Sequence, residues 1–263
     1  MRPPLNRRLG RLCATAALLS SACFPSTAPA GEDDKAAEKA PPGAAGWVEL
    51  IGASGGLDAF QGNHAGWKAV ASTSLDQTNP KRLQGTPGTG VVFNGAIGRA
   101  PNLVTRQKFG DVEVHLEFMV PQNSNSGVKL EEVYEIQIFD SFDVKKATAS
   151  HSGGIYPRAE LLPKYHHIDD GYPPLVNASL PPGEWQTLDI KYLAPRFDAS
   201  GKKTDDARFV KVVLNGRVVQ DNVAVPCPTG NNWRNKEQPT GPLLLQGDHG
   251  PVAFRNVRVR PLR

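Results

Sequence analysis

The sequence is poor in cysteine and in aromatic residues, and both shortages limit what the protein can be. Only three of its 263 residues are cysteine, namely Cys13, Cys23 and Cys227. Two of them lie within the first 30 residues, so a chain that loses this segment can form neither an internal disulfide nor a thiolate zinc site. Aromatic residues make up 7% of the chain, too few for a stacking platform spread along it. Stability must come from a hydrophobic core.

The N-terminus lacks an apolar run long enough to cross a membrane. Leu12–Leu19 is apolar but too short to span a bilayer. It follows four arginines, the pattern of an export leader, which we place at residues 1–30. Two processing routes stay open, cleavage after Ala30 or lipidation of Cys23. We expect an exported protein, either periplasmic or anchored in the cell envelope, with a lipid at Cys23 as its only membrane contact.

Without the leader, the chain has no excess of positive or negative charge. The chain carries a net charge of +4, with 30 Lys and Arg residues against 26 Asp and Glu residues. Cleavage after Ala30 removes four arginines and no acidic residue, which leaves 26 bases and 26 acids. The basic isoelectric point therefore belongs to the leader, and we expect no nucleic-acid partner.

The rest of the chain divides into a linker and one domain. Residues 31–46 are rich in Ala, Pro, Gly and charge, a composition typical of a flexible tether. Residues 47–263 contain no second segment of this kind and no internal repeat, so they are predicted to form a single domain.

Alternating polarity predicts β-strands in this domain, and no stretch shows a sustained helical period. In residues 111–120 every second residue is apolar, which is the two-residue period of a strand. Asn215-Gly216 lies between two further apolar segments and predicts a β-hairpin. The other predicted strands are 133–139, 185–192, 209–214, 217–223, 243–246 and 254–260. Short strands joined by Gly- and Pro-rich loops favour an all-β, two-sheet antiparallel sandwich of jelly-roll type.

Several motifs occur in an order that resembles one family. The most specific pair is Asn125–Val128 (NSGV) followed by Tyr134–Ser141 (YEIQIFDS). The chain resembles the 3-keto-disaccharide hydrolase family over its whole body. The further motifs are Gly154–Tyr156, Pro174–Ala178, Pro182–Trp185, Leu214–Gly216, Asn222, Gly241–Leu243, Gln246, His249–Gly250 and Phe254–Val257.

This resemblance implies a fold and an activity. The fold is a concanavalin A-like jelly roll, and the substrates are glycosides whose C3 hydroxyl has been oxidised to a ketone. The usual opening motif of the family is replaced by Leu50–Ala53, and a short insertion, Ser54–Leu57, follows it. The departure concerns a loop at the rim of the site.

A ketone at C3 sets the chemistry that such a site must perform. It acidifies the C2 proton, so a base can form an enolate that expels the group on C1. Water can add afterwards, which makes the net reaction an elimination or a hydrolysis. The site needs a base and donors for the enolate oxygen. The paired carboxylates of ordinary glycosidases are not needed.

Two other functions remain as alternatives. A non-catalytic carbohydrate-binding module of lectin-like fold uses the same architecture. An ordinary glycosidase of laminarinase type wants an E-x-D-x-x-E array, whereas Glu135 is followed by Gln137. If His249 lies in the same groove as Glu135 and Gln137, the enzyme is favoured over the binding module.

Three residues are the catalytic candidates, namely Glu135, His249 and Lys129. Glu135 and Gln137 project from one face of their strand, with Gln137 as a substrate contact. That face is otherwise a solvated surface without function. His249 lies in a Gly-flanked turn and could remove the C2 proton or bind a divalent ion; otherwise it is a loop histidine. Lys129 could stabilise the enolate or be an ordinary exposed lysine.

The remaining candidates concern substrate binding and a metal ion. Asn125 and Ser126 could contact sugar hydroxyls or simply form a tight turn. Tyr156 could stack on a sugar ring or pack in the core, and Gln246 is a further substrate contact. Asp140 could join Glu135 and His249 around a divalent metal ion, or form a turn. His166 and His167 are adjacent on an extended segment and therefore point in opposite directions, which speaks against a metal site.

Overall fold

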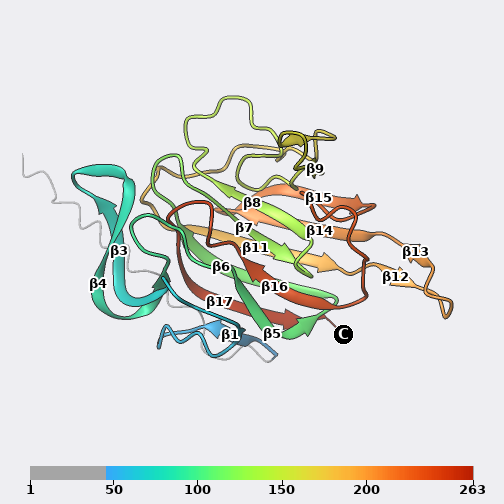
Figure 1. Cartoon of the computed structure of the whole chain (residues 1–263), viewed down its shortest axis with the longest axis horizontal. Helices are drawn as coiled ribbons and strands as arrows, with labels where there is room; N and C mark the ends of the chain where they lie inside the picture. Colours follow the sequence, from blue (N-terminus) through green and yellow to red (C-terminus); the bar gives the residue numbers. More distant parts are fainter. Residues whose placement is uncertain (1–45, 263) are drawn as a thin grey trace, which may run out of the picture. The chain divides into compact units, whose positions relative to one another are not determined.

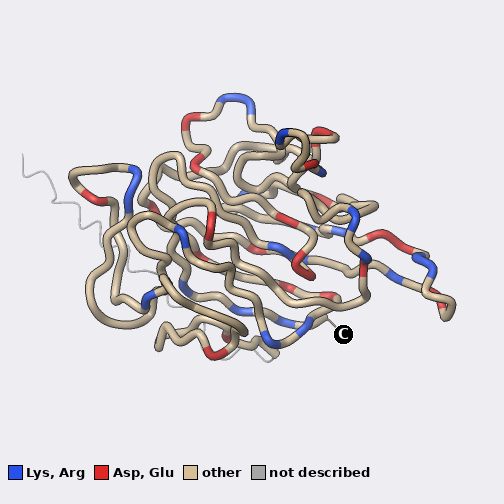
Figure 2. Tube along the Cα trace, in the orientation of Figure 1, with Lys and Arg blue, Asp and Glu red and all other residues tan. Residues whose placement is uncertain are grey.

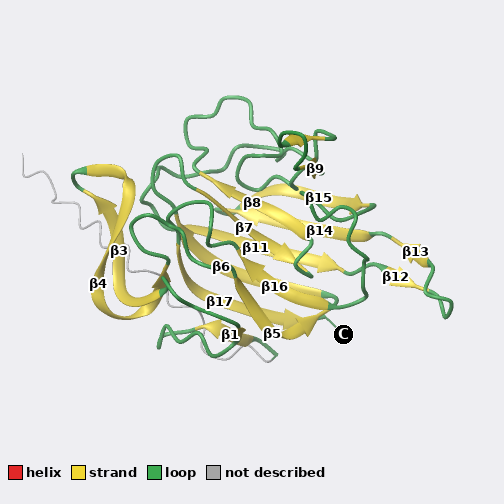
Figure 3. Cartoon of the chain, in the orientation of Figure 1, coloured by secondary structure: helices red, strands yellow, loops and turns green. Residues whose placement is uncertain are grey.

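The structure, a computed structural model, describes residues 46–262, which form β-strands and loops without a helix (Figures 1 and 3). The predicted leader, with Cys23, lies outside the described residues, and of the tether only Gly46 is described. No helix in the described part of the chain could cross a membrane.

Eight strands form the larger sheet, all joined as antiparallel pairs. Seven of them follow one path, and β1 (Val48–Ile51) pairs with β17 beside it. In spatial order the seven are β15 (Arg217–Val225), β14 (Ala207–Leu214), β11 (Gln186–Leu193), β6 (Val112–Met119), β17 (Ala253–Pro261), β4 (Asn79–Phe93) and β3 (Lys68–Asp76). Acidic residues of β6 pair with basic residues of β17, as in the Glu117–Arg255 pair, and Figure 2 colours the two kinds of residue along the chain.

Five strands form the smaller antiparallel sheet, which carries the functional site. In spatial order they are β2 (Phe60–Gln61), β5 (Leu103–Phe109), β16 (Gly241–Leu245), β7 (Asn125–Leu130) and β8 (Tyr134–Phe139). Two short strand pairs complete the fold, namely β9 (Ala159–Glu160) with β10 (His166–His167), and β12 (Arg196–Phe197) with β13 (Lys203–Asp205).

One hydrophobic core joins the two sheets. Phe118 and Tyr192 contribute to it from the larger sheet, and Tyr134 and Ile136 from the smaller one; all four are fully buried. The alternation of the strands therefore places their apolar side chains between the sheets and their polar side chains outside. The predicted all-β sandwich is confirmed.

Most of the predicted strands are found within a few residues of their predicted ends. The hairpin at Asn215-Gly216 joins β14 and β15, with Asn215 in the left-handed conformation that such a turn requires. The long β3–β4 pair was not predicted, because Pro80, Pro87 and several glycines interrupt the alternation of β4. The strand that carries Glu135, β8, is the last of the five strands in its sheet.

Candidate active site

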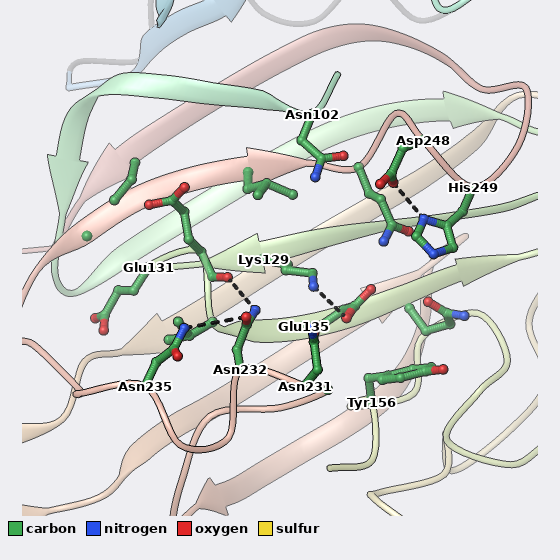
Figure 4. Close-up of a pocket in the computed structure, with 18 of the residues that line it drawn as sticks. Asn102, Lys129, Glu131, Glu135, Tyr156, Asn231, Asn232, Asn235, Asp248 and His249 are labelled. Carbon is green, nitrogen blue, oxygen red and sulfur yellow. Dashed lines mark hydrogen bonds and ion pairs between the residues drawn. The ribbon is translucent and has the colours of Figure 1, made fainter. Parts of the chain in front are cut away.

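A cleft of about 1120 Å³ lies on the outer face of the smaller sheet. Its floor consists of the outward side chains of β7, β8 and β16, whose inward neighbours, such as Val128 and Ile136, belong to the core. One wall contains Tyr156 and the β9–β10 hairpin, and another contains residues 230–240. Figure 4 shows polar side chains from floor and walls converging on this space.

Lys129 and Glu135 form an ion pair on the floor. They face each other across β7 and β8, and the Lys129 Nζ lies 3.2 Å from the Glu135 Oε2. Only 4% of Glu135 is exposed, and this burial raises the pKa of its carboxyl, an effect that the Lys129 charge opposes. The carboxylate lies over Gly127, where an added Cβ would clash with the Glu135 Oε1. The pair therefore depends on the absence of a side chain at Gly127.

His249 reaches the cleft from the turn after β16. Its Nδ1 lies 2.6 Å from the Asp248 Oδ1, and about half of each side chain is exposed. A carboxylate at this distance favours the tautomer in which Nδ1 carries the proton, which leaves Nε2 free to accept one. In Figure 4 the imidazole stands above the Lys129–Glu135 pair. The turn thus presents an imidazole whose orientation is set by Asp248.

Two asparagine side chains hold this turn in place. The Asn94 side chain donates hydrogen bonds to the carbonyls of Gly247 and Gly250, both at 2.8 Å, and accepts one from the Val252 amide at 2.7 Å. The Asn102 side chain accepts a hydrogen bond from the Gly247 amide. The position of His249 is therefore fixed from both flanks.

Two glutamine side chains offer free acceptors beside the ion pair. The Oε1 atoms of Gln137 and Gln246 are buried in the cleft lining and have no hydrogen-bond partner in the protein. The Nε2 of Gln137 donates to Asn125 Oδ1 and to the Ser150 carbonyl, both at 3.3 Å. Buried polar atoms without a partner are costly, so these oxygens suit the hydroxyl groups of a bound ligand.

Tyr156 forms part of the cleft wall below Glu135 in Figure 4. Its hydroxyl lies 2.7 Å from that of Tyr165 and 3.2 Å from the His167 Nε2, so the ring is held at its far end. Burial raises the pKa of this hydroxyl, and the Tyr165 hydrogen bond adds to the shift. The aromatic ring is thereby fixed as a contact surface.

The structure brings together seven of the nine residues predicted for the site. The residues that line the cleft are Asn125, Lys129, Glu135, Gln137, Tyr156, Gln246 and His249. Ser126 does not reach it, because its position on β7 turns it inward, where its hydroxyl donates to the Gln246 carbonyl at 2.8 Å. The predicted substrate contact of Ser126 is replaced by a structural hydrogen bond.

Asp140 also lies outside the cleft lining, and the predicted metal site is not assembled. Its Oδ2 accepts a hydrogen bond from the Asn123 amide at 2.9 Å, which is the turn-forming role considered as its alternative. Among residues 46–262, no three His, Cys, Asp or Glu side chains are placed to share an ion. The donor set proposed for a metal does not fit.

Comparison with known proteins identifies the family. Residues 46–260 match the family model of the 3-keto-alpha-glucoside-1,2-lyase-like domain. The chain belongs to this family. The resemblance inferred from its motifs is thereby confirmed. Membership in this family indicates that this lyase-like domain acts on carbohydrates. No curated protein matches the chain significantly.

Three crystal structures of candidate glycosyl hydrolases from Parabacteroides distasonis resemble this lyase-like domain. One is 28% identical, with a TM-score of 0.53, and the match covers 77% of this chain and 82% of that one. The others are 16% and 20% identical, both with a TM-score of 0.51, and cover 83% and 82% of this chain and 95% and 99% of theirs. At that identity the latter two show the fold alone.

Sequence reasoning missed several residues of this lyase-like domain's cleft. Asp248 adjoins His249 in the sequence, yet only the turn geometry shows that the two side chains bond to each other. Asn231, Asn232 and Asn235 form a conspicuous amide-rich run, but nothing in its pattern tells which wall it joins. Glu131 also lines the cleft, and its burial depends on residues distant in the sequence.

Proposed function

We propose that this lyase-like domain cleaves 3-keto-glycosides by removing the C2 proton and eliminating the group on C1. The observation that carries the proposal is that one cleft contains an imidazole oriented by Asp248 and an ammonium group held by Glu135. The first supplies a base, and the second supplies a positive charge for the enolate. A site that only bound sugar would need neither.

In the proposed reaction, the His249 Nε2 removes the proton from C2 of the sugar. The electrons of the C–H bond form the C2–C3 double bond, and the negative charge moves to the ketone oxygen, where Lys129 stabilises it. Glu135 keeps the ammonium group in position, while Gln137 and Gln246 accept hydrogen bonds from sugar hydroxyls.

The enolate then expels the aglycone. As the C3 ketone is restored, a C1–C2 double bond forms and the C1–O bond breaks. The leaving oxygen takes the electron pair of that bond and is protonated by the His249 imidazolium, which returns the histidine to its neutral form. Water added across the double bond in a later step makes the net reaction a hydrolysis.

The test uses a 3-keto-glucoside and its unoxidised parent, each with and without a chelator. Deuterium at C2 should slow cleavage of the keto form, because the C2–H bond breaks in the proposed step, and the parent should remain intact. His249→Ala should lower kcat by about 10² to 10⁴. His115→Ala is the matched control, because His115 makes the same bond to a carboxylate, Asp189, at 2.7 Å on the other sheet.

Three results would contradict the proposal. Cleavage of the parent would indicate an ordinary glycosidase, and binding without cleavage of either glycoside would indicate a carbohydrate-binding module. Equal rates for the C2–H and C2–D substrates, together with full activity of His249→Ala, would remove the elimination mechanism while leaving the substrate class in place.

A further inference from the structure

The two side chains that the β9–β10 hairpin contributes to the cleft lining are apolar or aromatic, unlike those of the polar floor. Leu161 and Tyr165 both line the cleft and are 55% and 47% exposed. The neighbouring Leu162 is 79% exposed. Isolated exposed leucines are common on protein surfaces, whereas a contiguous apolar group that borders a ligand site marks a place where apolar surface becomes buried.

Tyr156 extends this apolar surface into the cleft. Its hydroxyl is tied to Tyr165 and His167, so its ring is held in position and adds a flat face beside the hairpin. The rings of Tyr156 and Tyr165 each pack edge-on against the ring of His167, with centroid distances of 5.3 and 5.6 Å. The hairpin tip is therefore a preformed surface rather than a loose loop.

Two side chains of the asparagine-rich wall are already engaged within the protein. The Asn232 side chain already donates to the Glu132 carbonyl at 3.2 Å, and the Asn235 side chain donates to Asn232 Oδ1 at 3.4 Å (Figure 4). These amide donors hold the wall segment itself. The free acceptors of Gln137 and Gln246 lie instead beside the Lys129–Glu135 ion pair, where the oxidised sugar is placed in the proposed reaction.

We infer that the surface formed by Tyr156, Leu161 and Tyr165 binds an apolar, aromatic aglycone. The substrates would then be 3-keto-glucosides of aromatic alcohols or phenols, with the oxidised sugar over Lys129 and the flat leaving group against the hairpin. A second sugar gains little from leucine side chains, because burial of its hydroxyls there leaves them without partners. This inference rests on the proposed function, since the occupant is the group that the elimination releases.

Methyl and benzyl 3-keto-glucosides of the same anomer provide the test. Their leaving alcohols differ little in acidity, so a difference in kcat/KM reports contact with the aglycone rather than leaving-group chemistry. We expect the wild-type protein to favour the benzyl glycoside by about tenfold or more, since burial of a phenyl group against apolar side chains is favourable by more than the ~1.4 kcal/mol that a factor of ten requires.

Variants of the hairpin locate the contact. Leu161→Asn, similar in size but polar, should reduce the preference for benzyl over methyl by about fivefold. Leu175→Asn is the matched control, because Leu175 is a 69% exposed leucine outside the cleft lining, and it should leave the preference unchanged. Thermal unfolding of both variants would show that the exposed substitutions leave the fold intact.

Three outcomes would overturn the inference. Equal wild-type kcat/KM for the two glycosides, or faster cleavage of a 3-keto-disaccharide than of the benzyl glycoside, would exclude an aromatic aglycone site. An equal effect of Leu161→Asn on both glycosides would exclude the hairpin as its location. Calorimetric binding of the same glycosides gives the preference even without cleavage, so failure of the reaction and failure of this inference are distinguishable.

Discussion

Glu131 combines a buried carboxyl group with an unfavourable backbone conformation. Its carboxyl is buried beside the Tyr192 hydroxyl, and this burial raises its pKa to about 8. Glu131 and Glu132 also adopt positive φ angles of 55° and 63°, which cost roughly 1 to 3 kcal/mol each in non-glycine residues. Both belong to the turn between β7 and β8, the strands that carry Lys129 and Glu135.

The raised pKa makes stability depend on pH. In the unfolded chain the Glu131 carboxyl titrates near its ordinary value of 4.5, whereas in the folded protein it keeps its proton until about pH 8. Unfolding therefore releases a proton between these values, and the free energy of unfolding falls by about 1.4 kcal/mol per pH unit as the pH rises. The loss is complete above pH 8.

Replacement of Glu131 by glutamine should remove this dependence. We expect Glu131→Gln to be more stable than the wild type at pH 8, by on the order of 3 kcal/mol, and the difference to shrink towards pH 5. Urea unfolding at several pH values measures it, with the exposed Glu184→Gln as control. Parallel pH profiles for Glu131→Gln and the wild type would show that Glu131 is not buried in its neutral form.

Residue alternation predicts only part of the site. Glu135, Gln137 and Lys129 lie at outward positions of strands whose apolar residues are plain in the sequence, so they could be assigned to one face. The environment of Glu131 could not be predicted, because the Tyr192 hydroxyl beside it comes from β11 of the other sheet. Ser126 shows the converse, since its hydroxyl is polar but its position on β7 is an inward one.

At the level of elements, the β7–β8 hairpin holds the proposed catalytic pair. Gly127 lies in an extended conformation that other residues adopt readily, so the backbone does not require a glycine here. What the site requires is the free space above Gly127. The Glu135 carboxyl fills that space. The hairpin thus places an acid on a backbone that leaves room for it.

Gly127→Ala should displace the Glu135 carboxylate and weaken its pairing with Lys129. We expect kcat/KM on a 3-keto-glucoside to fall by about 10- to 100-fold, because misplacement of a catalytic group by about 1 Å has effects of this size. The control is Gly56→Ala, whose new Cβ would meet nothing closer than 3.5 Å. Unchanged activity of Gly127→Ala, measured by initial rates, would show that the position of the carboxylate does not matter.

Strand prediction succeeded where apolar and polar residues alternate without interruption, as in β6 and β11. It failed for β4, whose 15 residues include prolines and glycines and which is stabilised by pairing with β3 and β17. Partners of that kind are non-local, and a single strand's sequence does not reveal them.

For the whole chain, the leader predicts the cellular location. We propose that the protein is exported through residues 1–30 and works in the cell envelope. Mass spectrometry of the protein purified from a bacterial host should find the chain starting at Gly31, or at a lipidated Cys23. Cys23→Ser should release the protein from the membrane fraction only in the second case. An intact N-terminus and a cytoplasmic location would contradict the proposal.

The position of β8 at the edge of its sheet has a consequence for how the molecule behaves at high concentration. Its outward backbone groups are already bonded, for example the Gln137 amide to the Gly154 carbonyl and the Tyr156 amide to the Glu135 carbonyl, both at 2.9 to 3.0 Å. A second copy of the chain therefore finds no open ladder to extend there. Engineering that shortens residues 150–156 to widen the cleft would uncover this ladder, so broader specificity would come with self-association.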